Sequence, residues 1–125
     1  MLREEFKALL RESVGEEHAK ITLEALAKEP ATSIRLNPAK ISQCPFEGAE
    51  KILWSPYGYI LKERPVFTLD PLFHAGCYYV QDSSAMFVGE LLRQVLPSFG
   101  PGISVLDLCA APGGKTTDLA ASLPE

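Results

Sequence analysis

The first thirty residues repeat their apolar positions at helical spacing. Leu2, Phe6, Leu9 and Leu10 occupy positions i, i+4, i+7 and i+8, which places them on one face of a helix. Gly15 interrupts this pattern, and a second apolar face follows it, made of Ala19, Leu23, Leu26 and Ala27. Pro30 ends the second helix because proline cannot continue one. The pattern predicts a helical hairpin.

The next segments are short and alternate apolar with polar residues. Ser33–Pro38 alternates in this way and predicts a strand that leads into a turn. Ile52–Trp54 and Tyr59–Leu61 predict two more strands around a turn at Ser55–Gly58. Tyr78–Val80 predicts a further short strand. We therefore expect a small mixed domain of helices and strands over residues 1–77.

A third helix is predicted after residue 82. Asp82 or Ser83 can cap its first turn, and Pro97 ends it. Its apolar face repeats at helical spacing and consists of Ala85, Gly89, Leu92 and Leu96.

The stretch from Ile103 to Thr117 predicts a strand, a glycine turn and a helix. Ile103–Leu108 is an almost unbroken apolar run, typical of a strand buried on both faces of a parallel sheet. Pro112–Gly114 ends the run, and a helix is expected from Lys115 to Pro124. Such a turn exposes backbone N–H groups at the start of a helix, where a negative group is favoured. This turn is a candidate nucleotide or cofactor site.

Two familiar phosphate-binding motifs do not fit the turn. A phosphate loop needs a glycine five positions before Gly114, and that position is Cys109. The Gly-x-Gly-x-x-Gly pattern of dinucleotide-binding proteins does not occur near it. What the turn offers is the carboxylate of Asp107 at the end of the strand, followed by a short proline–glycine loop.

Composition and charge exclude some classes of protein but do not indicate a function. The chain has 125 residues, of which 46% are hydrophobic and 22% charged, and its net charge is −4. This charge gives no sign of the basic stripe that nucleic-acid binders usually carry. No apolar run is long enough for a membrane span, and the N-terminus lacks a signal peptide. Three widely spaced cysteines favour reduced thiols in the cytoplasm, without a metal site.

Three segments resemble one family in the order expected. Asp107–Thr116 reads Asp-Leu-Cys-Ala-Ala-Pro-Gly-Gly-Lys-Thr and closely resembles the cofactor motif of the Sun-type (Nop/Sun) RNA (cytosine-5)-methyltransferases. Ser33–Lys40 resembles the Ser-Ile-Arg-x-Asn-x-x-Lys signature of the family's N-terminal domains. Tyr79–Met86 resembles the motif that precedes the cofactor strand and lies beside the cofactor and the target base.

The resemblance implies an α/β fold, in which residues 1–77 form an N-terminal α+β domain and residues 78–125 begin a Rossmann-like catalytic domain. It implies that S-adenosylmethionine binds to Cys109, Ala110, Ala111, Pro112, Gly113, Gly114 and Lys115. It implies that Lys115 has an auxiliary role in catalysis. It also implies that Arg35 and Lys40 face RNA, in this case ribosomal RNA. Cys109 is expected to be a small loop residue that lines the cofactor pocket.

The resemblance also implies that the chemistry is incomplete in these residues. The family's nucleophilic cysteine adds to carbon 6 of cytosine and lies in later motifs, which we expect beyond Glu125. We therefore expect an inactive N-terminal fragment whose strand edge at Ile103–Leu108 meets the rest of the methyltransferase domain or a second copy. Two alternatives stay open: a non-catalytic RNA-binding or scaffold module, and a fragment of a phosphate-loop NTPase.

Overall fold

The computed structural model describes residues 2–123 and separates the chain into two units, Met1–Ala31 and Thr32–Glu125. The first unit is a hairpin of two helices, α1 (Glu4–Val14) and α2 (Glu16–Leu26). Gly15 connects them with a positive φ of 81°, a conformation that glycine adopts without strain. Ala19 of α2 is buried in the unit. The predicted hairpin is confirmed.

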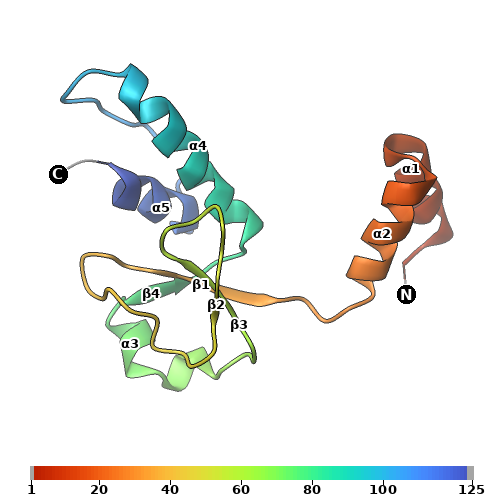
Figure 1. The fold of residues 1–125 in the computed structure, drawn as a ribbon, viewed down its shortest axis with the longest axis horizontal. Helices are drawn as coiled ribbons and strands as arrows, with labels where there is room; N and C mark the ends of the chain where they lie inside the picture. The colour runs from red at the N-terminus through yellow and green to blue at the C-terminus, as the bar shows by residue number, and fades with distance from the viewer. Residues whose placement is uncertain (1, 124–125) are drawn as a thin grey trace. The chain divides into compact units, whose positions relative to one another are not determined.

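The second unit is built on a four-stranded antiparallel sheet with the order β2-β3-β1-β4 (Figure 1). Its strands are β1 (Thr32–Leu36), β2 (Glu50–Lys51), β3 (Gly58–Leu61) and β4 (Tyr78–Val80). β1 is central and pairs with both β3 and β4. The strands predicted at Ser33–Pro38, Tyr59–Leu61 and Tyr78–Val80 are thereby confirmed.

The strand predicted at Ile52–Trp54 is wrong, because the turn begins earlier than expected. The backbone N–H of Ile52 donates to Gly58, and that of Ser55 donates to the carbonyl of Ile52. Leu53 and Trp54 therefore lie in the turn, and the paired residues of β2 come before it.

Two longer helices and four short helical segments complete this unit. The longer helices are α4 (Phe87–Val95) and α5 (Gly114–Ser122), which pack side by side next to the sheet (Figure 1). The short segments are η1 (Phe67–Leu69), α3 (Pro71–His74), η2 (Ser84–Met86) and η3 (Leu96–Ser98). The helix expected after Asp82 is thus confirmed, although its first turn is a 3₁₀ turn. No helix within residues 2–123 has the length and apolar character to cross a membrane.

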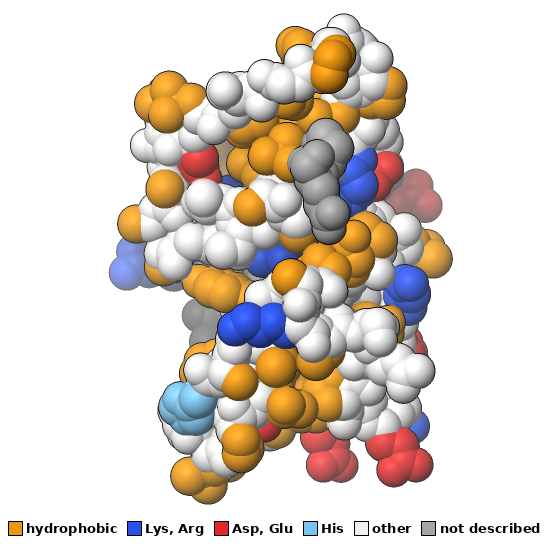
Figure 2. Space-filling model, turned by 90° about the vertical axis from the view of Figure 1, so that its left-hand side faces the viewer, with side chains coloured by type: hydrophobic (Ala, Val, Ile, Leu, Met, Phe, Trp, Pro, Cys, Tyr) orange, Lys and Arg blue, Asp and Glu red, His pale blue; other side chains and the backbone are white. Residues whose placement is uncertain are grey.

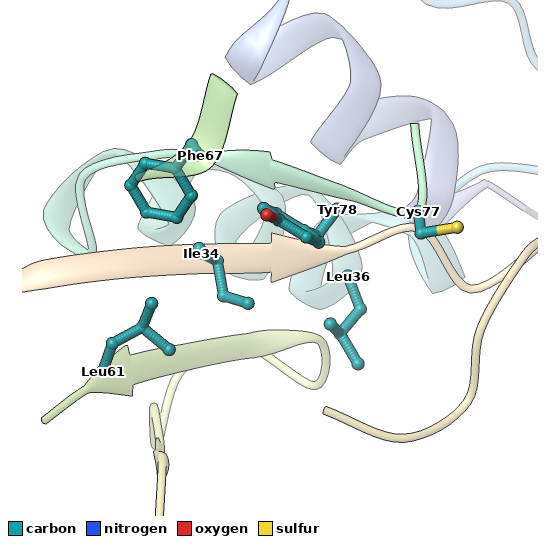
Figure 3. Close-up of a cluster of buried hydrophobic side chains, with 6 residues drawn as sticks. All are labelled: Ile34, Leu36, Leu61, Phe67, Cys77 and Tyr78. Carbon is teal, nitrogen blue, oxygen red and sulfur yellow. The ribbon is translucent and has the colours of Figure 1, made fainter. Parts of the chain in front are cut away.

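Side chains of β1 are buried on both faces of the sheet. Ile34 and Leu36 point into a hydrophobic cluster on one face (Figure 3), whose other members are Leu61, Phe67, Cys77 and Tyr78. Ser33 and Arg35 are equally buried on the opposite face, where Arg35 contacts α5. Because side chains alternate along a strand, β1 joins the apolar core to the helices.

The strand predicted at Ile103–Leu108 does not form among the described residues, so it is not confirmed. These residues have no strand pairing and follow an irregular path from α4 to α5. Leu106 and Leu108 are 81% and 86% exposed. A parallel strand forms only when neighbouring strands accept its hydrogen bonds, and β1 to β4 pair with one another instead.

The structure therefore supports a mixture of helices and antiparallel sheet, whereas the parallel βα unit stays unconfirmed. The predicted last helix is confirmed as α5, and Pro124, its expected end, lies outside the described residues. β4, which begins at Tyr78, pairs with β1 of the preceding segment. The predicted domain boundary between residues 77 and 78 stays a prediction. Figure 2 shows hydrophobic side chains spread over the whole height of one face, with Lys and Arg side chains among them.

Candidate functional site

A groove lies between the end of β4 and the loop that leads into α5. Its volume is about 230 Å³. One wall comes from Tyr79, Val80, Gln81, Asp82 and Ala85. The other wall comes from Cys109, Ala110, Ala111, Pro112, Gly114 and Lys115. The structure thus brings together two segments that the sequence singled out separately, and six of the seven predicted cofactor residues line one groove.

Asp107 fixes the shape of the loop by binding it at two points. Its Oδ1 accepts a hydrogen bond from the backbone N–H of Cys109 at 2.9 Å, and its Oδ2 accepts one from Oγ1 of Thr116 at 2.7 Å. The hydrogen bond from Thr116, followed by that from Cys109, lowers the pKa of Asp107 below its ordinary value. The carboxylate is therefore charged at neutral pH and holds the two ends of the loop together.

The glycines of the loop are required for two different reasons. Gly113 precedes α5 with a φ of 108°, which side chains other than hydrogen rarely allow. Gly114 begins the helix, and a Cβ at this position would lie 3.3 Å from the Tyr79 ring. Tyr79 also donates from its hydroxyl to the carbonyl of Pro112 at 3.3 Å. The loop therefore packs closely against β4, which forms the groove.

Cys109 and Lys115 are both exposed at the edge of this groove. Lys115 lies in the first turn of α5, where the N-terminal backbone N–H groups point outward. Cys109 lies in the loop wall, and its part in a cofactor pocket stays a prediction. Cys77 is buried in the hydrophobic cluster, and all three cysteines are free thiols within the described residues.

Arg35 lies in the interior of the unit and not on a surface that could face RNA. Its side chain binds α5. Only 3% of its surface is exposed. Its Nη2 donates to Oγ1 of Thr117, and that hydroxyl in turn donates to the carbonyl of Gly113 at 2.8 Å. Its Nε lies 3.8 Å from Oδ1 of Asp118, whose side chain is fully buried. This position does not agree with the expectation that Arg35 meets RNA phosphates, because the guanidinium is used inside the chain.

The buried pair changes the ionisation of both partners. Burial raises the pKa of Asp118, since the charged carboxylate loses its hydration, and the nearby Arg35 opposes that rise. Burial likewise lowers the pKa of Arg35, and Asp118 opposes that change. Sequence reasoning missed Asp118, because an aspartate within a helix carries no signal until α4 is known to cover it.

Lys40 differs from Arg35 because it is exposed. Its Nζ donates to the carbonyl of Ala75. With Arg35 and Tyr79 it lines a second, larger groove of about 510 Å³. An RNA contact by Lys40 stays a prediction.

Comparison with known proteins places this arrangement in a family. Residues 2–83 match the family model described as the N-terminal domain of 16S rRNA methyltransferase RsmF. The chain belongs to this RsmF N-terminal domain family. The matched region extends from α1 to the residue before η2, so it includes Arg35 and the groove residues Tyr79–Asp82.

Two relatives and one solved structure resemble the RsmF-family chain. Ribosomal RNA small subunit methyltransferase B of Photorhabdus laumondii is 46% identical over 66 residues, which are 53% of this chain and 14% of that protein. The protein of the same name in Cronobacter sakazakii is 48% identical over 61 residues, 49% of this chain and 13% of that protein. This chain therefore spans only about one seventh of the length of these relatives.

The structural match is more extensive. A crystal structure described as a methyltransferase homolog protein from Pyrococcus horikoshii superposes with a TM-score of 0.72 at 30% identity. It covers 97% of this chain and 41% of that protein. The likeness therefore includes the segment after residue 83, which the RsmF-family match leaves out.

Proposed function

We propose that this chain is the N-terminal part of an S-adenosylmethionine-dependent RNA (cytosine-5)-methyltransferase that acts on ribosomal RNA. The observation that carries the proposal is the groove between β4 and the Cys109–Lys115 loop. Its two walls are the two segments whose sequences resemble the motifs on either side of the family's cofactor. The names of the relatives point to ribosomal RNA as the substrate, and the same proposal includes a cytoplasmic location.

The groove has features that fit this cofactor. Gly113 and Gly114 bring backbone close to the groove without side chains, and the first turn of α5 presents N–H groups. A volume of about 230 Å³ is below the roughly 300–1,000 Å³ of sites for drug-sized ligands, so it suits one portion of the cofactor. When bound, S-adenosylmethionine supplies a methyl group on a positively charged sulfur.

The residues of this chain would hold the cofactor in place. Asp107 holds the loop closed, and Tyr79 supports it through the carbonyl of Pro112. Lys115 stands at the mouth of the groove, where an ammonium group can orient an acidic group or the target base. The nucleophile that adds to carbon 6 of cytosine belongs to motifs that the resemblance places after this segment. Ile103–Leu108 becomes the first strand of a Rossmann-like sheet once neighbouring strands pair with it.

Ultraviolet crosslinking tests this assignment. The chain is irradiated with tritium-labelled S-adenosylmethionine at millimolar concentration, and the labelled peptides are mapped. We expect the label in peptides that contain Tyr79–Asp82 or Cys109–Lys115, and less of it when unlabelled S-adenosylhomocysteine competes. Label confined to other peptides, or label that the competitor does not reduce, would overturn the assignment.

A further inference from the structure

The side chain of Gln81 has a buried donor without a partner. Gln81 is 7% exposed, and its Nε2 has no hydrogen bond among the described residues. Buried polar groups in folded proteins are nearly always hydrogen-bonded, so each exception asks for an explanation. Gln81 lines the groove, and its Nε2 lies 3.8 Å from the position that a Cβ on Gly114 would occupy. The unpaired donor thus faces the loop at the start of α5.

The orientation of this amide follows from its neighbour. The other end of the side chain, Oε1, lies 2.9 Å from Nε of Arg35, which can only donate. The atom that faces Arg35 must therefore be the oxygen, and the atom that faces the groove must be the NH₂ group. Ser33 on β1 also fixes the residue: the backbone N–H of Gln81 donates to the carbonyl of Ser33, and Ser33 Oγ donates to the carbonyl of Gln81 at 2.6 Å. Gln81 is held as a donor toward the groove.

The charges around the groove indicate what this donor meets. Lys115 and the N-terminus of α5 favour an anion, whereas Asp82 supplies a carboxylate on the opposite wall. The backbone N–H and the hydroxyl of Ser84 both donate to Oδ1 of Asp82. A groove of this size that offers donors from Gln81, Lys115 and the start of α5, together with the carboxylate of Asp82, fits an amino-acid zwitterion.

We propose that Nε2 of Gln81 donates a hydrogen bond to the carboxylate of the amino-acid moiety of S-adenosylmethionine, with the ammonium of that moiety toward Asp82. The proposal rests on the proposed function, because it names the part of the cofactor that enters this groove. Arg35 serves as the positioning residue that keeps the NH₂ end of Gln81 in the groove.

Nuclear magnetic resonance of the Gln81 side chain tests the proposal. The ¹⁵N-labelled chain is titrated to millimolar concentration with S-adenosylhomocysteine, which carries the amino-acid moiety, and with methylthioadenosine, which lacks it. We expect the Gln81 NH₂ resonances to shift with S-adenosylhomocysteine and to stay in place with methylthioadenosine. A shift of the Cys109–Lys115 backbone amides without any shift of the Gln81 NH₂ group would overturn the proposal and leave the cofactor site intact.

Other outcomes separate the two claims further. A Gln81 shift with cytidine but not with S-adenosylhomocysteine would assign the donor to the base and overturn the proposal. No shift at either the loop or Gln81 would overturn both the proposal and the cofactor assignment.

Matched variants add an affinity readout. Gln81→Glu keeps the length of the side chain and an acceptor for Arg35, but it replaces the donor by a second oxygen. We expect its dissociation constant for S-adenosylhomocysteine to rise at least tenfold, whereas the exposed Gln43→Glu changes it less than twofold. Equal affinities of the two variants would contradict the proposal. If Gln81→Glu does not fold, the shift of the Gln81 NH₂ resonances in the unaltered chain still tests the proposal.

Discussion

At the residue scale, Arg35 connects the central strand to the helix that follows the groove. Its guanidinium reaches the Gln81 side chain, the Thr117 hydroxyl and the Asp118 carboxylate. Through Thr117 it also contacts the backbone of Gly113 indirectly. One buried cation therefore supports both walls of the groove.

Removing this cation should cost far more than removing a surface one. Arg35→Ala leaves the Asp118 carboxylate buried without its partner, and breaking a buried pair in this way costs about 3–5 kcal/mol. Urea unfolding followed by circular dichroism measures the loss. The matched control is Arg64→Ala, an exposed arginine over the Phe67 ring, which should lose at most about 1 kcal/mol. A loss below 1 kcal/mol for Arg35→Ala would contradict the buried network.

Asp118 makes the stability of the chain depend on pH in a defined direction. Its pKa is raised above the ordinary value of 3.8 by burial, so the folded chain binds this proton more tightly than the unfolded chain does. The stabilisation from Asp118 is therefore complete below about pH 3.8 and is lost as the pH rises through the folded value. Asp118→Asn cannot titrate at this position.

The stability of the unaltered chain minus that of Asp118→Asn should fall as the pH is raised from 3.5 toward neutrality. Urea unfolding of both proteins across this range measures the difference, in which the other carboxylates cancel. A difference in the free energy of unfolding that grows with pH would show that the charge of Arg35 affects the pKa of Asp118 more than burial does.

At the element scale, the loop before α5 depends on backbone conformations that only glycine allows freely. Gly113→Ala places a Cβ at a φ of 108° and should cost about 1–3 kcal/mol in loop stability or in cofactor affinity. Gly100→Ala is the control, since Gly100 has open space around it and no positive φ. Titration with S-adenosylhomocysteine should show weaker binding for Gly113→Ala alone. Equal affinity in both variants would argue against a backbone-built site.

Elements with a local signal could be predicted from the sequence, and those that depend on distant partners could not. The α1–α2 hairpin, the helix after Asp82 and α5 follow from apolar spacing, caps and glycines within each segment. The Ile103–Leu108 run carries the composition of a buried strand, but a strand also needs neighbours, and its side chains are exposed in this chain.

The same distinction applies to the site. The Cys109–Lys115 loop could be predicted from its motif, and it does line the groove. Arg35 was expected to face RNA because the resemblance of Ser33–Lys40 implied it, yet α5 covers that face of β1. The unpaired amide of Gln81 and the burial of Asp118 depend on tertiary packing, so they carry no signal in the sequence.

At the scale of the whole molecule, the exposed apolar loop should bind protein rather than remain in water. Leu106 and Leu108 are 81% and 86% exposed, which favours association with another protein surface, such as a second copy of this chain. Sedimentation at increasing concentration should show self-association that Leu106→Asp together with Leu108→Asp reduces. A monomer at every concentration would contradict this expectation for a second copy.

The chain by itself should not transfer methyl groups to ribosomal RNA. Cys77 is buried, Cys109 belongs to the loop wall, and Cys44 packs against the hydrophobic cluster, so none is placed as the nucleophile. Incubation with labelled S-adenosylmethionine and unmodified ribosomal RNA should leave the RNA unlabelled. Robust labelling would contradict this reading of the three thiols.

The most direct test of the central claim is a calorimetric comparison of two ligands. S-adenosylhomocysteine and ATP are titrated separately into the chain at millimolar concentration. If the groove between β4 and the Cys109–Lys115 loop is a methyltransferase cofactor site, S-adenosylhomocysteine gives saturable binding heat and ATP gives none. Binding of ATP in preference to S-adenosylhomocysteine would favour the phosphate-loop alternative and contradict the account.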